Sequence, residues 1–242
     1  MKHTAFILCL TLSISAQMMA QETGSGNILK DIKGLVKPAD TSVPRTDIAS
    51  GLKEALIVGA ELSGKKLSAV DGFFGNAVLK ILLPPEAVKV EQKLRGMGLG
   101  KQVDQAILTV NRAAEDAAKS AAPIFIQAIR EMTIQDAAGI LRGGDTAATS
   151  YLRGRTSLTL TEAFRPVIDK SLEKVGATRH WNTIFNAYNR FAREKVNPDL
   201  AGYVTDRALY GIFMQLGEEE RKIRKDPLAR TTDLLRRVFG KN

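Results

Sequence analysis

The chain has 242 residues, of which 44% are hydrophobic and 25% charged, and its formal net charge is +9. This composition is ordinary for a globular protein. The length suits one domain or two small ones, and it suffices to bury a large core without disulfides or metals. The positive excess would attract an anionic partner, which for a basic protein means lipid, glycan or nucleic acid.

Residues 1–20 have the pattern of a secretory signal peptide. Lys2 precedes an apolar stretch from Ala5 to Ile14, and the small residue Ala20 stands at the expected cleavage point, with Ala16 as an alternative. The apolar stretch is shorter than the roughly 20 residues that cross a bilayer. A buried N-terminal helix is the other interpretation. We expect a cleaved signal and an exported protein that is periplasmic or associated with the bacterial envelope.

Removal of the signal peptide would leave a mature chain without cysteine, because Cys9 is the only one. Such a chain forms no disulfide, thiolate nucleophile or cysteine-ligated metal site. His180 would be its only histidine, which is too few for the usual zinc site of three or four cysteine or histidine ligands. We therefore expect no metal and no cofactor. No later stretch is long and apolar enough to span a membrane.

Residues 21–45 mix glycine, serine, proline and charged residues, which predicts a flexible leader before the folded part. From residue 46 to residue 242 the apolar spacing is helical almost throughout. The first predicted helix ends before a turn at residues 71–76, and Pro84-Pro85 opens the next one, which ends at residues 96–100. The apolar stripes of these helices are Ile48, Leu52, Ala55, Leu56 and Leu62 in the first, and Val88, Val90, Leu94 and Met97 in the second.

A long helix follows, and Pro123 kinks or divides it. Thr133 and Asp136 have the spacing of a capping box, which predicts a short helix ending at residues 143–144. The apolar positions of the long helix at helical spacing are Val103, Ile107, Val110, Ala114 and Ala117, continued by Ile124, Phe125, Ala128, Ile129 and Met132.

We expect Asp145 to cap the next helix, and Asn197 to cap another that has Pro198 at its first position. The remaining predicted helices cover residues 160–175, 181–191, 198–224 and 231–239. No stretch alternates apolar and polar residues for long enough to be a convincing strand. The sequence therefore predicts an all-α fold, with a single irregular multi-helix bundle domain over residues 46–242.

Residues 59–66 approximate a phosphate-binding loop, in which glycines let backbone N–H groups wrap phosphates and a lysine reaches the outer ones. Lys66 lies where a serine or threonine would hold magnesium, and no apolar strand ending in aspartate follows. A glycine-interrupted amphipathic helix is the better interpretation.

Two groups of polar residues are candidates for a ligand pocket. Asn111, Arg112 and Glu115 are neighbours on a helix face, either as a surface ion pair or as a partly buried polar network that lines a pocket. Residues 143–149 offer N–H groups at a helix start, where an anion could dock unless Asp145 caps them. The candidate pocket residues are Asn111, Arg112, Glu115, Asp136, Asp145 and Thr149.

The C-terminal part of the chain is strongly basic, with eight basic and two acidic residues from Arg221 onward. The residues predicted to attract an anionic partner are Arg221, Lys222, Arg224, Lys225, Arg230, Arg236 and Arg237. Within residues 231–239 an apolar stripe lies beside basic residues, so this short helix docks on the domain or lies on an anionic membrane surface. The expected partners are anionic lipid, envelope glycan or another envelope protein. We expect no nucleic-acid partner, because an exported protein seldom meets one.

Several short blocks, in this order, resemble the uncharacterised bacterial family known as domain of unknown function 4197. These blocks are residues 71–76, 111–115, 132–137, 143–149, 230–235 and 238–240. The resemblance covers the chain from about Leu52 to the end. It implies a helical envelope protein that carries a signal peptide, and it implies no activity.

The sequence favours an exported helical binding or interaction protein of the bacterial envelope. Two alternatives stay open. A carboxylate-dependent hydrolase of cell-wall glycan would use two of Asp71, Glu115, Asp136 and Asp145 in one cleft. A carrier of an apolar ligand would contain an enclosed cavity of several hundred Å3 lined by leucine, isoleucine and phenylalanine.

Overall fold

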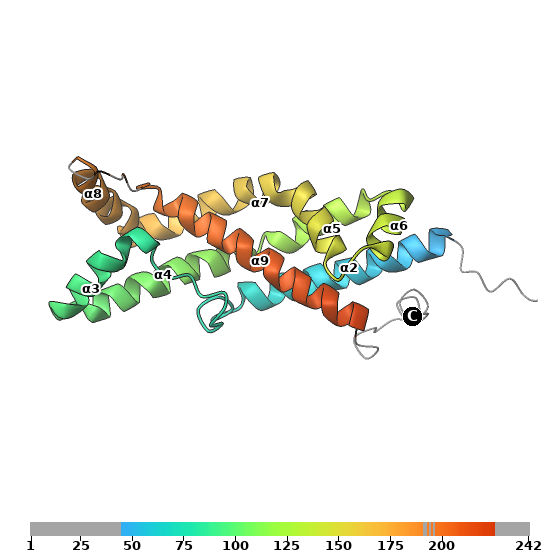
Figure 1. The fold of residues 1–242 in the computed structure, drawn as a ribbon, viewed down its shortest axis with the longest axis horizontal. Helices are drawn as coiled ribbons and strands as arrows, with labels where there is room; N and C mark the ends of the chain where they lie inside the picture. The colour runs from blue at the N-terminus through green and yellow to red at the C-terminus, as the bar shows by residue number, and fades with distance from the viewer. Residues whose placement is uncertain (1–44, 191–192, 194, 196, 226–242) are drawn as a thin grey trace, which may run out of the picture. The chain divides into compact units, whose positions relative to one another are not determined.

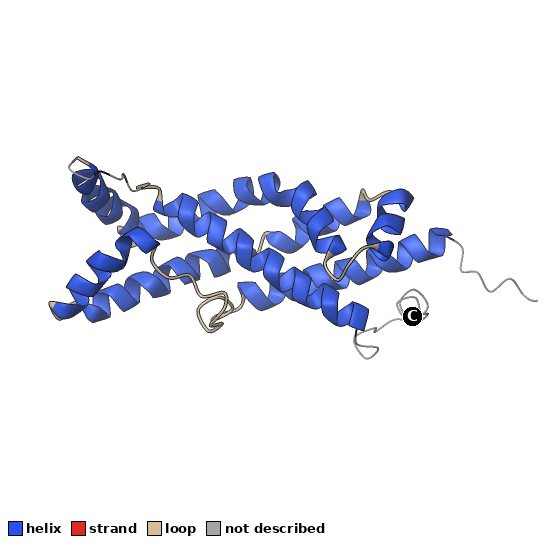
Figure 2. Cartoon of the chain, viewed as in Figure 1, coloured by secondary structure: helices blue, strands red, loops and turns tan. Residues whose placement is uncertain are grey.

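The computed structural model describes residues 45–190, 193, 195 and 197–225, which form helices joined by turns and loops, with no strand among them (Figures 1 and 2). These residues belong to one compact unit that begins at Val43. The predicted all-α bundle is confirmed. The predicted signal peptide, leader and helix at 231–239 lie outside the described residues, as do Arg230, Arg236 and Arg237.

The helices of the described part, in chain order, are α2 (Arg45–Ser68), the 3-10 turn η1 (Pro85–Ala87), α3 (Val88–Gly96), α4 (Gly100–Ala118), α5 (Ala121–Arg130), α6 (Ile134–Arg142), α7 (Ala147–Lys174), α8 (Ala177–Asn189) and α9 (Leu200–Lys225). Helix α7 packs against α4, α5 and α9, and α2 packs against α5, α6 and α9 (Figure 1). None of these helices is both long and apolar enough to cross a membrane.

Helix α7 supplies a continuous apolar stripe to the core. Leu160, Phe164, Ile168 and Leu172 recur every four residues and are fully buried. This spacing places them on one face of a helix, which packs on α4 and α9. The predicted helix at 160–175 is thus the second half of a longer helix that begins at Ala147.

Helix α2 has the predicted core residues at its start but not at its middle. Leu52, Ala55 and Leu56 are buried, whereas Leu62 is 49% exposed and Ser63 is buried in its place. The hydroxyl of Ser63 donates to the carbonyl of Gly59 at 2.7 Å, which satisfies its polar group inside the core. The phosphate-loop pattern at residues 59–66 lies within this helix, so the helical interpretation is confirmed.

Two of the predicted helix boundaries are confirmed, and the predicted cap of α9 is wrong. Thr133 and Asp136 form the predicted capping box at the start of α6. The chain is divided before Pro123, which lies in the first turn of α5. Asn197 does not cap α9: its Oδ1 accepts from the N–H of Asp199 in the preceding turn, and Asp199 Oδ1 accepts from the N–H of Gly202 instead.

Candidate functional site

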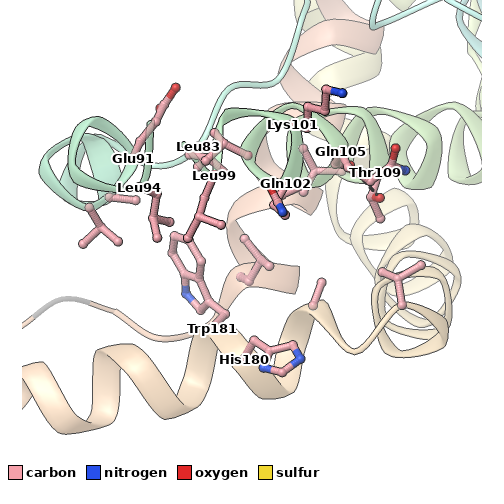
Figure 3. Close-up of a pocket in the computed structure, with 18 residues that line it drawn as sticks. Leu83, Glu91, Leu94, Leu99, Lys101, Gln102, Gln105, Thr109, His180 and Trp181 are labelled. Carbon is pink, nitrogen blue, oxygen red and sulfur yellow. Dashed lines mark hydrogen bonds between the residues drawn. The ribbon is translucent and has the colours of Figure 1, made fainter. Parts of the chain in front are cut away.

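A groove of about 680 Å3, partly open to solvent, lies between α3, α4, α8 and the start of α9 (Figure 3). Its volume lies within the range of small-ligand pockets, about 300–1,000 Å3. Most of its wall is apolar. The apolar lining consists of Leu83, Ala87, Val90, Leu94, Leu99, Val103, Ala106, Val110, Val175, Ala177, Trp181 and Leu200.

Helix α3 forms one wall of the groove because its apolar face is not covered by the rest of the described chain. All of α3 is described, and none of its residues is buried. The sequence predicted an apolar stripe here, and the structure leaves Val88 and Met97 exposed, while Val90 and Leu94 line the groove half-buried. Helix α3 packs on η1 and α4, which leaves its apolar residues facing the groove.

A tight turn at Gly98 places α3 beside α4. Gly98 has φ +82°, a conformation that glycine adopts without strain, and the N–H of Leu99 donates to the carbonyl of Leu94 at 2.9 Å. This turn brings Leu94 and Leu99 to the same wall of the groove. The predicted helix end at residues 96–100 is confirmed, as is its interpretation as a turn.

Helix α8 forms the opposite wall. Figure 3 shows the indole of Trp181 extending from α8 toward Leu83 and Leu99. Trp181 is the only tryptophan of the chain and is 9% exposed. Gly176, with φ +68°, makes the short turn that joins α8 to α7. His180 is exposed and lines the groove beside Trp181.

The groove has a polar side along α4. Lys101, Gln105 and Thr109 follow each other at intervals of four residues, and all three line the groove (Figure 3). Glu91 lines it from α3 and is bound by Arg95 at 2.9 Å. Arg95 also binds Asp104 at 2.8 Å. Hydrogen bonds to Asp104 and Glu91 raise the pKa of Arg95.

The candidate residues Arg112 and Glu115 belong to a network that holds the loop between α2 and η1. Glu115 is 3% exposed, and its Oε1 accepts from the backbone N–H groups of Phe73 and Phe74, each at 3.1 Å. Its Oε2 accepts from Arg112 at 2.6 Å. Arg112 also binds Asp71 at 2.7 Å, and hydrogen bonds to Glu115 and Asp71 raise the pKa of Arg112.

Asn111 holds the same loop at a second point. Its Oδ1 accepts from the N–H of Ile81 at 2.8 Å, and its Nδ2 donates to the carbonyl of Ile81 at 2.7 Å. Asn111 is fully buried. Of the two interpretations left open by the sequence, the buried network is confirmed over the surface ion pair. Ligand binding by Asn111, Arg112 and Glu115 stays a prediction.

At the first of these anchor points, the loop packs the aromatic side chain of Phe73 on α9. Phe73 is fully buried against Gly211. A Cβ atom at position 211 would overlap Cε1 of Phe73, so the close approach requires glycine. The network and this contact together fix the loop, from α4 on one side and from α9 on the other.

The carboxylate of Asp136 is part of the capping box at the start of α6. It accepts from the N–H of Thr133 at 2.9 Å and from the Thr133 hydroxyl at 2.8 Å. These two bonds lower the pKa of Asp136, with a smaller contribution from the hydroxyl of Tyr151 at 3.3 Å.

The start of α7 is capped by a residue that the sequence did not indicate. Asp145 makes no cap; it forms an ion pair with Lys225, which lowers the pKa of Asp145. Glu220 of α9 accepts instead from the N–H groups of Ala148 and Thr149, at 2.9 and 2.8 Å. It also accepts from the Thr149 hydroxyl at 2.8 Å. The prediction that Asp145 caps this helix is wrong, and the chain's own carboxylate occupies the N–H groups at which an anion was considered.

The basic residues at the end of α9 are largely paired within the described part. Arg224 is 12% exposed in its side chain, binds Glu220 at 2.9 Å and donates to the carbonyl of Ile140. Lys222 binds Glu219, and Lys225 binds Asp145. Electrostatic attraction of an anionic partner by Arg221, Lys222, Arg224 and Lys225 stays a prediction.

A family model described as "Protein of unknown function (DUF4197)" matches residues 42–240. The chain belongs to this family. The resemblance seen in the short sequence blocks is thereby confirmed. No curated protein matches the DUF4197 chain, and no solved structure matches it.

The sequence did not indicate the groove of this DUF4197 protein as a site. The six predicted pocket residues lie outside its lining. They belong instead to three separate contacts, namely the α4 network, the α6 cap and the start of α7. Among the described residues no group of three or more histidine, cysteine, aspartate or glutamate side chains could hold a metal ion. The features of the sequence that could have indicated the groove are an amphipathic nine-residue helix followed by a glycine-rich turn, and the only tryptophan, which lies elsewhere in the chain.

Proposed function

We propose that the protein is an exported helical binding protein of the bacterial envelope whose groove binds the aliphatic chain of a small ligand. The apolar groove between α3, α4 and α8 is the observation that carries this proposal. It resembles the carrier hypothesis from the sequence, with two differences: the site is partly open rather than enclosed, and leucine, valine, alanine and tryptophan line it.

The proposal follows from the energetics of apolar surface in water. Each methylene group of a ligand that leaves water gains about 0.8 kcal/mol, and burial of the facing side chains adds to this. Val90 and Leu94 on α3 are half-buried in the free protein, so a ligand would cover apolar surface that the described chain leaves accessible. Trp181, which is mostly buried, contributes an apolar aromatic side chain to the other wall.

Export is the second part of the proposal, and it rests on residues 1–20. Their basic start, short apolar run and terminal small residue are the features of a secretory signal. The mass of the protein purified from the periplasm of its host tests this directly. A mature N-terminus after Ala20 or Ala16 supports export, and a full-length protein found in the cytosol contradicts it.

Glycan hydrolysis has less support from the arrangement of carboxylates. The two oxygens of buried Glu115 are occupied by Phe73, Phe74 and Arg112. Asp136 and Asp145 make their own contacts at α6 and Lys225. A hydrolase needs two carboxyl groups that face one cleft, about 5 Å apart or further.

Trp181 allows a direct test of ligand binding in the full chain. A long-chain fatty acid with bromine at mid-chain quenches tryptophan on contact, so titration should quench the emission of Trp181 in a saturable manner. Leu94→Gln, in the groove, should weaken this quenching about tenfold, which corresponds to loss of one well-buried apolar contact.

Leu158→Gln is the matched control, because Leu158 is 73% exposed on α7 and lies outside the groove lining. The brominated fatty acid should quench the Trp181 emission of this variant as strongly as that of the unchanged protein. Absence of quenching in the unchanged protein, or equal loss in the two variants, overturns the proposed binding function.

A further inference from the structure

The groove is amphipathic, and its polar side has a defined composition. On α4 the side chains of Lys101, Gln105 and Thr109 share one helix face along the groove. Val103 and Val110 line the same groove from the adjacent buried face of α4. A ligand that lies against α4 thus meets apolar carbon on one side and a cation with hydrogen-bonding groups on the other.

The charge of the polar side is positive. Glu91 is the one carboxylate in the lining, and Arg95 already binds it at 2.9 Å. In the part of the chain that the structure describes, no carboxylate lies within ion-pair distance of Lys101. Lys101 lines the groove and is exposed, and Figure 3 shows its ammonium group pointing away from Trp181. Lys101 is therefore placed to bind an anion at the edge of an apolar surface.

The neighbouring elements add to this positive charge. Residues 83–100 contribute three further basic residues and two acidic ones. Helix α8 contains Arg179 and no aspartate or glutamate between Ala177 and Asn189. A cationic ligand would be repelled by this surface, and a neutral one would leave the charge of Lys101 unused.

We infer that the ligand is an amphiphile with one aliphatic chain and an anionic head group, with the chain between Trp181 and Leu94 and the head group at Lys101. This inference rests on the proposed function and adds the charge and orientation of the ligand. A long-chain carboxylate is the simplest compound of this class. The volume of about 680 Å3 is that of a site for one small ligand.

The test compares three compounds with the same sixteen-carbon chain: a carboxylate, an alcohol and a trimethylammonium salt. Each displaces the brominated fatty acid from the full chain, and recovery of Trp181 emission gives its Kd. The carboxylate should bind about fivefold more tightly than the alcohol, the scale of one partly screened ion pair, and the trimethylammonium salt most weakly.

Lys101→Gln should reduce the affinity for the carboxylate to that for the alcohol. The affinity for the alcohol should stay unchanged. Lys66→Gln is the matched control, because Lys66 is exposed on α2 outside the groove lining and its loss changes the net charge equally. The preference for the carboxylate should also fall in 1 M salt, where the Debye length is about 3 Å.

The possible failures are distinguishable. If no compound binds, the proposed function is overturned. If all three bind equally and Lys101→Gln has no effect, binding of an aliphatic chain stands and the anionic head group is overturned. If vesicles of a two-chain anionic phospholipid bind the protein while the single-chain carboxylate does not, the occupant is a membrane lipid and the inference is overturned.

Discussion

The start of α7 and the groove differ in whether another part of the chain covers the groups that they expose. At the start of α7, the free N–H groups of Ala148 and Thr149 are bound by Glu220 from another helix. At the groove, the apolar side chains of Val90 and Leu94 are only half-covered by the described chain. The comparison separates a region that stabilises the fold from one that is free to bind. Substitutions at the start of α7 should therefore lower stability, and substitutions at the groove should lower ligand binding with little change in stability.

The largest expected effect is that of Glu220→Ala. It removes the acceptor for three donors at the start of α7, and it removes the carboxylate that the mostly buried Arg224 binds at 2.9 Å. Breaking a buried pair in this way costs about 3–5 kcal/mol of the free energy of unfolding. Urea denaturation measures the loss. Glu61→Ala, at an exposed position of α2, is the control and should change little. A loss below about 1 kcal/mol for Glu220→Ala would contradict the assigned cap.

Asn111→Ala should have the next largest effect. It leaves the N–H and carbonyl groups of Ile81 without partners in a buried position. Unsatisfied buried groups cost about 1–3 kcal/mol each, so we expect a total loss of about 2–3 kcal/mol, with some relief by water. Hydrogen exchange should show faster exchange at Ile81, whereas Asn186→Ala, at an exposed position of α8, should leave it unchanged. Unchanged exchange in the Asn111 variant would mean that the loop is held elsewhere.

Asp136→Asn should have a smaller effect that depends on pH. The bonds from Thr133 lower the pKa of Asp136 in the folded protein, so its charge contributes stability at pH values above the unfolded value of about 3.9. That contribution is lost as the pH falls through the folded pKa. The variant should be less stable than the unchanged protein at neutral pH, and the difference should shrink in acid. Thermal melting across this pH range measures it, and a difference that grows in acid would be the wrong sign.

Leu94→Gln should change stability least and binding most. Helix α3 has no buried residue, so we expect a change in the free energy of unfolding below about 0.5 kcal/mol. Its binding of the brominated fatty acid should nevertheless weaken, as proposed above. A loss of stability comparable to that of Glu220→Ala would place Leu94 in the core and remove the distinction between the two regions.

Local patterns in the sequence predicted the parts of this fold that local physics decides. The apolar spacing of Val103, Ile107 and Val110 gives a buried face of α4, and the Thr133–Asp136 pair caps α6 because its members are three residues apart. The cap of α7 comes from Glu220, 72 residues from Ala148, and no local rule connects the two. Glu115 and Phe73 are likewise 42 residues apart.

The groove was missed for a related reason. An apolar stripe on a helix predicts a covered face, and Val90 and Leu94 have that pattern. Whether another helix covers the face depends on the tertiary arrangement, which the stripe itself does not specify. Trp181 shows the same difficulty, because nothing local places α8 opposite α3.

Glycine at position 211 matters for the hydrogen bonding of buried Glu115 as well as for the packing of Phe73. A methyl group there would push Phe73 away from α9, and the N–H of Phe73 would move away from the carboxylate of Glu115 with it. A steric change on α9 would thus become an electrostatic penalty on α4, where a buried anion would lose one of its donors. Any protein of this architecture that enlarges position 211 should also carry a smaller residue at position 73.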